Sequence, residues 1–169
     1  MKIGGRNAIA ALLCAPVLLG ATPAFAGASV TALSQAEVLQ EIQFAVLLDM
    51  NFGRIALRDS VTGGDVTIDP SSSGRTCSAT LVCTGAFGVS RLELSGSDAN
   101  VQVNFTPTFQ LTGPGDPILA EPQFPGGPGA VVRLTGGHTV VNFGAVLHIN
   151  PGQAAGVYSG QFTVNLENN

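Results

Sequence analysis

The sequence has no tryptophan, a single tyrosine and few charged side chains. Of its 169 residues only 11% are charged, with 7 Lys or Arg against 11 Asp or Glu. A net charge of −4 without a basic cluster argues against nucleic-acid binding. The 22 glycines and 10 prolines exclude a helix bundle. Because 45% of the residues are hydrophobic, disorder is excluded too. A single β-rich domain remains.

The motifs that mark common enzymes and metal sites are also missing. There is no Gly-x-Ser-x-Gly elbow, no His-Glu-x-x-His pair, no phosphate-binding loop and no acidic calcium loop. His138 and His148 are ten residues apart on one predicted strand. If the strand is straight they are separated by about 33 Å, too far to share a metal within one chain. We therefore expect no catalysis, no cofactor and no metal.

The first 26 residues have the pattern of a secretory signal peptide. Lys2 and Arg6 precede an apolar run over 8–19, and Ala24-Phe25-Ala26 forms a small-x-small cleavage site. The run is too short to span a bilayer as a helix. No later apolar run of 18 residues exists, so we expect no membrane anchor. The predicted destination is the periplasm, the cell surface or the medium.

Cleavage after Ala26 leaves two cysteines, Cys77 and Cys83. An even pair in an exported protein predicts a disulfide. On one straight strand the two residues would be about 20 Å apart, whereas a disulfide needs Cα atoms within about 7 Å. The bond therefore requires a turn near residues 78–80. We favour a structural disulfide, because a redox site would suit a Cys-x-x-Cys spacing better.

Hydrophobic residues alternate with polar ones over residues 28–52. Eleven of the thirteen even positions are apolar, which is typical of half-buried strands. The stretch is too long for one strand, and we divide it near Ser34. A short helix over 35–42 is an alternative, because Ser34 and Glu37 have the spacing of a capping box.

The same period recurs along the rest of the chain. Strands are predicted around Val66–Ile68, Leu92–Leu94 and Val101–Phe105. The six prolines between 107 and 128 predict a long connection with only short edge segments, near Phe109–Leu111 and Ile118–Ala120. Near the end, one strand face carries Val141, Phe143, Ala145, Leu147 and Ile149, and a later one carries Tyr158, Phe162, Val164 and Leu166. The pattern predicts an all-β, antiparallel β-sandwich.

Several of these segments resemble a bacterial family of secreted proteins, domain-of-unknown-function family 4402. They are Leu48–Gly53, Asp69-Pro70, Gly74-Arg75, Leu92–Gly96 and Gly144–Ile149 leading into Gln153–Val164. The chain departs from the family pattern in its cysteine pair and at Leu166–Asn169, which replaces the usual Val-x-Tyr-Asn finish. The resemblance implies export from Gram-negative bacteria and an immunoglobulin-like, pilin-like sandwich of Greek-key type. It implies no established activity.

Two functions follow as expectations. The first is a non-catalytic structural or adhesive subunit of the cell surface, similar to fimbrial proteins, with like subunits or a periplasmic chaperone and usher as partners. The second is a secreted ligand-binding module of carbohydrate type. Such modules stack sugars on exposed aromatic rings. With no Trp and a single Tyr, this chain is poorly equipped for that role.

The predicted organisation has three parts: signal peptide 1–26, N-terminal extension 27–38 and β-sandwich domain 39–169. In the extension, even positions from Ala28 through Val30 to Val38 form one apolar face. Such a segment can add to a sheet edge, in its own domain or in a neighbour. A flexible leader or an ordinary first strand are the alternatives. The residues expected to matter for the core and assembly are Val30, Val38, Tyr158, Phe162, Val164 and Leu166.

Overall fold

The computed structural model describes residues 35–38 and 40–168, which form strands and loops. The chain divides into a segment 1–36 and a compact unit 37–169, and the account below concerns the compact unit. Its strands are β1 (Gln43–Leu48), β2 (Arg54–Leu57), β3 (Gly64–Ile68), β4 (Arg75–Cys77), β5 (Leu81–Thr84), β6 (Ser90–Ser95), β7 (Ala99–Phe105), β8 (Phe109–Leu111), β9 (Ile118–Gln123), β10 (Ala130–Leu134), β11 (His138–Ile149) and β12 (Val164–Asn168).

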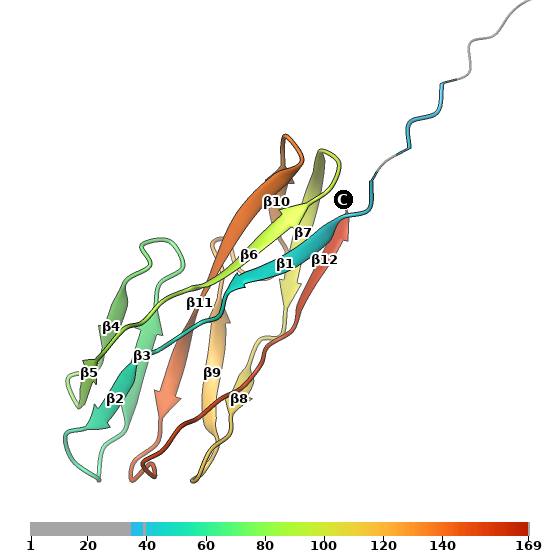
Figure 1. Ribbon diagram of the computed structural model, residues 1–169. Coiled ribbons are helices and arrows are strands. Elements are labelled where there is room, and N and C mark those ends of the chain that lie inside the picture. The colour runs from blue at the N-terminus through green and yellow to red at the C-terminus, as the bar shows by residue number, and fades with distance from the viewer. Residues whose placement is uncertain (1–34, 39, 169) are drawn as a thin grey trace, which may run out of the picture. The chain divides into compact units, whose positions relative to one another are not determined.

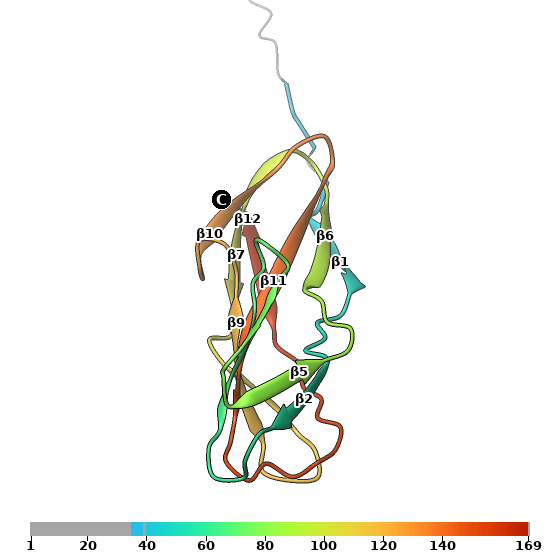
Figure 2. The same ribbon diagram turned by 90° about the vertical axis from the view of Figure 1, so that its left-hand side faces the viewer.

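The strands pair antiparallel in three sheets. The largest has seven strands in the order β1-β6-β11-β3-β4, with β9 also pairing with β11 and β8 pairing with β9. The other two sheets are β10-β7-β12 and β2-β5. The side view in Figure 2 shows β10, β7 and β12 in one layer and β6 and β1 in the other. The predicted all-β, antiparallel sandwich is therefore confirmed.

Strand β11 runs through both halves of the sandwich. Its first half pairs with β6, and its second half pairs with β3 on one side and β9 on the other. The face predicted to be apolar is buried along its whole length, from Val141 to Ile149. The alternation of inward and outward side chains thus continues without interruption along β11, although its first half and its second half pack beside different strands.

The buried side chains form two clusters. The upper cluster, at the top of Figure 1, consists of Leu92, Leu94, Val101, Val103, Phe105, Leu134, Val141 and Phe143. The lower cluster consists of Phe52, Val66, Ile68, Leu81, Val89, Leu111, Ile118, Ala120, Ala145, Leu147 and Ile149. Met50, on the segment that joins β1 to β2, packs against both.

The proline-rich region differs from the prediction. Strand β8 occupies the expected residues, but β9 extends to Gln123 and lies between β8 and β11, so the expectation of a short edge segment there was wrong. Pro122 is tolerated because it lies beyond Ala120, the last β9 residue that pairs with β8. Because only β11 pairs with β9 at this residue, the missing N–H of Pro122 can remove a backbone hydrogen bond on that side alone.

The start of the sandwich decides between two earlier alternatives. Residues 35–38 and 40–42 form no helix, and β1 begins at Gln43. The short helix considered for 35–42 is therefore absent from the described part of this segment. The predicted signal peptide and most of the extension, including Val30, lie outside the described residues. Within the described residues, no helix has the length and apolar character needed to cross a membrane.

Candidate functional site

A groove of about 1130 Å³ lies along one margin of the sandwich. One wall is formed by β1 and residues 49–57, and the other by residues 153–162 and Val164 of β12. Strands β1 and β12 are the last strands of their sheets. Figure 1 shows them along the same margin, and Figure 2 shows them in opposite layers. The groove is thus the open seam between two sheets that do not join.

The β1 wall presents apolar side chains that the described part of the chain leaves about half exposed. Phe44 and Val46 stand opposite Leu94 and Leu92 of β6, which are buried. Residues opposite each other in an antiparallel pair share a face, so Phe44 and Val46 point between the layers. Their side chains nevertheless remain 56% and 58% exposed. The exposure follows from the position of β1 at the edge.

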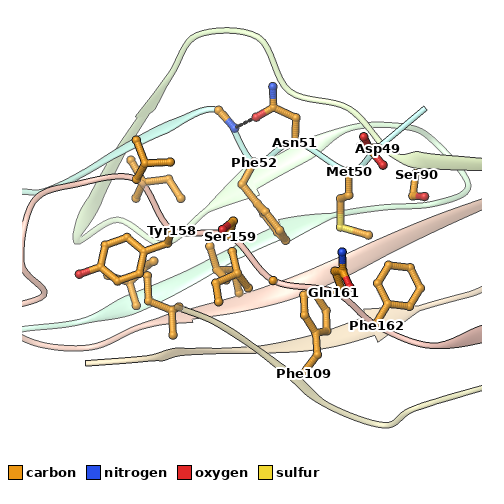
Figure 3. Close-up of a pocket in the computed structure, with 18 of the residues that line it drawn as sticks. Asp49, Met50, Asn51, Phe52, Ser90, Phe109, Tyr158, Ser159, Gln161 and Phe162 are labelled. Atoms are coloured by element: carbon orange, nitrogen blue, oxygen red, sulfur yellow. Dashed lines mark hydrogen bonds between the residues drawn. The ribbon is translucent and has the colours of Figure 1, made fainter. Parts of the chain in front are cut away.

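The floor of the groove is aromatic. Figure 3 shows Phe109 and Phe162 beside Met50 and Phe52. The Phe162 ring centroid lies 5.4 Å from that of Phe109 and 5.5 Å from that of Phe143. These rings connect the groove surface to the upper cluster, so side chains entering the groove would meet a preformed apolar surface.

Tyr158 holds the opposite wall in place. Its hydroxyl accepts hydrogen bonds from the Gly115 N–H at 3.0 Å and from Gln153 Nε2 at 2.9 Å. It donates to the Ala154 carbonyl oxygen at 2.9 Å. Its ring lies against Gly113, where a Cβ would clash with it. The one tyrosine of the chain therefore fastens the 153–158 loop to the loop after β8.

Polar side chains along the groove serve the neighbouring backbone. Asn51 Oδ1 accepts the Gly53 N–H at 2.9 Å, and Ser90 Oγ donates to the Leu48 carbonyl oxygen at 3.2 Å. Gln153 also donates to the Asp116 carbonyl oxygen. Among the residues that the structure describes, no group of three His, Cys, Asp or Glu is placed to hold a metal ion.

The two histidines lie away from the groove, on β11. His148 pairs with Asp65 of β3, with 2.8 Å between Nδ1 and Oδ1, and its Nε2 is 3.6 Å from Glu121 Oε1 of β9. His138 begins the strand at its other end, opposite Ser95. His148 thus lies between two carboxylates in a polar row across three strands of the large sheet.

The predicted disulfide between Cys77 and Cys83 is confirmed. The Cα atoms are 6.5 Å apart, and residues 78–80 make the required turn, closed by the Leu81 N–H donating to the Ser78 carbonyl oxygen. The flanking strands do not pair with each other, because β4 pairs with β3 and β5 pairs with β2. The bond therefore links the large sheet to the small one.

Four of the other predicted core and assembly residues lie in or next to the groove. Tyr158, Phe162 and Val164 line it, and Leu166 follows on the same face of β12. All four are half-buried. Strand β12 begins at Val164, later than the expected face, which started at Tyr158. Val38 precedes β1 and is 93% exposed.

Sequence reasoning did not assign Phe44, Val46, Met50 and Phe109 to this site. The signal was present for the first three, since they occupy even positions of the alternating stretch. Alternation identifies an inward face but does not tell whether another strand covers it.

The motifs that carry the resemblance have packing roles. Arg75 Nη1 donates to the Phe52 carbonyl oxygen at 2.8 Å and to that of Thr84 at 3.2 Å, and its guanidinium lies over the Phe87 ring. Gly53 has φ +80° and lies against Arg75, with no room for a Cβ. These motifs therefore join the β2–β5 sheet to β4.

Comparisons with known proteins agree with this architecture. The family model described as Domain of unknown function (DUF4402) matches residues 42–167, which extend from the residue before β1 into β12. Comparison with curated proteins and with solved structures finds no match. Since the match spans most of the chain, the protein belongs to the DUF4402 family.

Proposed function

We propose that the protein is an exported, non-catalytic subunit of the bacterial cell surface, structural or adhesive and similar to fimbrial subunits. The observation that carries this proposal is the open apolar groove beside β1. The signal-peptide pattern of residues 1–26 and the Cys77–Cys83 disulfide support export. The immunoglobulin-like, pilin-like and Greek-key description of the sandwich belongs to the same proposal.

The edge strand itself favours an interaction role. Strand β1 reads Gln-Phe-Ala-Val-Leu-Leu, with no charge, proline or glycine. Soluble proteins usually protect a free edge with charges, prolines or bulges, because an open apolar edge pairs with other chains. Strand β1 has a register shift only near its end, between Val46 and Leu48. We infer that the edge is kept open because another chain binds it.

The partners follow from this surface. Like subunits would cover the groove in the assembled state, and a periplasmic chaperone would cover it before assembly at an usher. We propose neither nucleic-acid binding nor a membrane anchor. The polar groups of the groove, such as Asn51 and Gln153, hold neighbouring backbone, which fits a binding surface better than a reaction site.

A secreted carbohydrate-binding module is the second candidate. It is favoured by Phe44, whose ring lines the groove and is 56% exposed, because sugars stack on such rings. A glycan array probed with the mature protein separates the two. Saturable glycan binding that is lost in Phe44→Ala would support the carbohydrate-binding module. If no glycan binds, the surface subunit remains the better candidate.

Surface labelling of intact cells tests the first candidate. An antiserum against the folded protein should label cells of the native host without permeabilisation, and shearing should release the antigen. A periplasmic marker protein serves as the control for leakage. Labelling that appears only after permeabilisation would overturn the proposal.

A further inference from the structure

We propose that the groove receives residues 28–38 of a second copy of the chain, added as a strand beside β1. This inference rests on the proposed function, because it names the partner of the same groove. The added strand would place its even-numbered side chains between the layers, against Phe44 and Val46. Its backbone would satisfy the free edge of β1.

Strand β1 is the better acceptor of the two edges. Strand β12 carries Asn165, Glu167 and Asn168, and a charge on an edge strand opposes pairing. The six residues of β1 are uncharged and all exposed. Phe44 and Val46 also point inward, so a strand beside them would bury apolar surface as well as pair backbone groups.

The segment 28–38 has the matching pattern. Its even positions are apolar except for Ser34, and its first charged residue is Glu37. At about 3.3 Å per residue the eleven residues reach roughly 36 Å, against about 20 Å for the six residues of β1. Val38, the last of the even positions, is 93% exposed, so its own unit does not cover it.

The geometry before β1 favours a second copy over the same chain. At the N-terminal end of β1, Gln43 pairs with Ser95, the final residue of β6. The Gln40 N–H donates to Ser97 Oγ at 2.7 Å, and Gly96 lies against Glu41 and Ile42. The chain therefore approaches β1 along the turn that follows β6. To pair with its own β1, it would have to leave these contacts and reverse within residues 39–42.

Strand addition of this kind joins unlike surfaces. The donor lies before one end of β1 and the acceptor lies beside it, so each copy can both give and receive a strand. A heterologous contact that does not close on itself yields a linear assembly. The inference therefore predicts chains of subunits rather than closed dimers.

Two substitutions and their matched neighbours test the proposal in the protein that begins at Gly27. Val30→Asp damages the donor and Val46→Asp damages the acceptor. Thr31→Asp and Ala45→Asp place the same charge one residue away, on the opposite face of each strand. Sedimentation velocity measures the assemblies, and circular dichroism verifies folding.

We expect Val30→Asp and Val46→Asp each to lower the assembled fraction at least tenfold, while Thr31→Asp and Ala45→Asp stay near wild type. An equimolar mixture of the two defective variants should form dimers, because one retains a donor and the other an acceptor. Folded variants that assemble like wild type, or a mixture that stays monomeric, would overturn strand addition. So would a wild-type protein that stays monomeric.

The two proposals fail separately. Surface labelling of intact cells tests the subunit role, and its result does not depend on how the variants assemble. If wild-type protein is displayed and assembles but is insensitive to Val30→Asp, then the subunit role stands and this partner is wrong. If assembly depends on both residues but the protein is absent from the surface, then the strand addition stands and the function is wrong.

Discussion

At the residue scale, single glycines decide whether strands can approach. Gly144 lies in β11 opposite Gln123, and a Cβ on it would overlap the Ile68 carbonyl oxygen and press on Pro70. The obstacle is backbone, which cannot swing away as a side chain tip can. The close approach of β3 to β11 therefore requires glycine at this position.

Gly144→Ala should accordingly be destabilised by about 1–3 kcal/mol, the usual range for forced overpacking. Gly88→Ala is the matched control, since a Cβ there meets no atom within 4 Å, and it should change stability by less than about 0.5 kcal/mol. Urea unfolding of both variants measures the difference. Equal stability of the two would contradict the packing described for Gly144.

Asp69 gives a residue-scale prediction of pH dependence. The Ser71 N–H, donated at 2.8 Å, and then the Ser72 hydroxyl hold the pKa of Asp69 below its usual value of 3.8. A lowered folded pKa contributes stability above the unfolded pKa, and this contribution is lost as pH falls through the folded value. Asp69→Asn keeps the acceptor and removes the charge.

The urea midpoint of wild type should therefore exceed that of Asp69→Asn at pH 6, with the gap closing below about pH 4. Because the carboxylate is fully exposed, the gap is small. A midpoint difference that stays constant down to pH 2 would show that the charge of Asp69 does not stabilise the turn between β3 and β4.

At the element scale, the Cys77–Cys83 bond ties β4 to β5. A loop this short contributes about 2–3 kcal/mol in the chain-entropy model. Reduction of wild type should lower its stability by that amount, measured by urea unfolding with and without reductant. A Cys77→Ala, Cys83→Ala double variant is the control and should not respond to reductant. Free thiols at both cysteines in the untreated protein would contradict the structure.

The final strand allows a test of register. Phe162 precedes β12, and its ring contacts Phe109 and Phe143 while staying half-buried. A fully buried Phe→Ala change costs about 3–5 kcal/mol, so the half-buried ring should cost about 2 kcal/mol. Thr163→Ala, on the exposed face, should be nearly silent. Thermal unfolding compares the two, and a loss for Thr163→Ala that equals or exceeds that for Phe162→Ala would contradict this register.

The elements also show where sequence reasoning ends. Alternation identified the buried face of β11, because a two-residue period is visible in the sequence whichever strands lie beside it. The proline argument failed for β9, because Pro122 excludes a strand only where both of its edges must pair at that residue, and the pairing partners depend on the tertiary structure. For β1 alternation found the inward face but not the missing neighbour.

At the scale of the whole molecule, the same limit applies to the candidate site. The sequence contained its parts, with Tyr158, Phe162 and Val164 at one end and the stretch around Phe44 at the other. Their meeting depends on which strands end each sheet, and topology brings together residues more than a hundred positions apart. The turn at residues 78–80, by contrast, could be predicted from the sequence, because a disulfide limits the distance between the two Cα atoms that it joins.

The path of β11 also has a thermodynamic consequence for the whole unit. The upper and lower clusters resemble two small cores, yet Val141 and Phe143 of this strand belong to one and Ala145, Leu147 and Ile149 to the other. Neither cluster can lose its packing without releasing a strand on which the other depends. The two halves should therefore melt together, with a calorimetric enthalpy equal to the van't Hoff enthalpy.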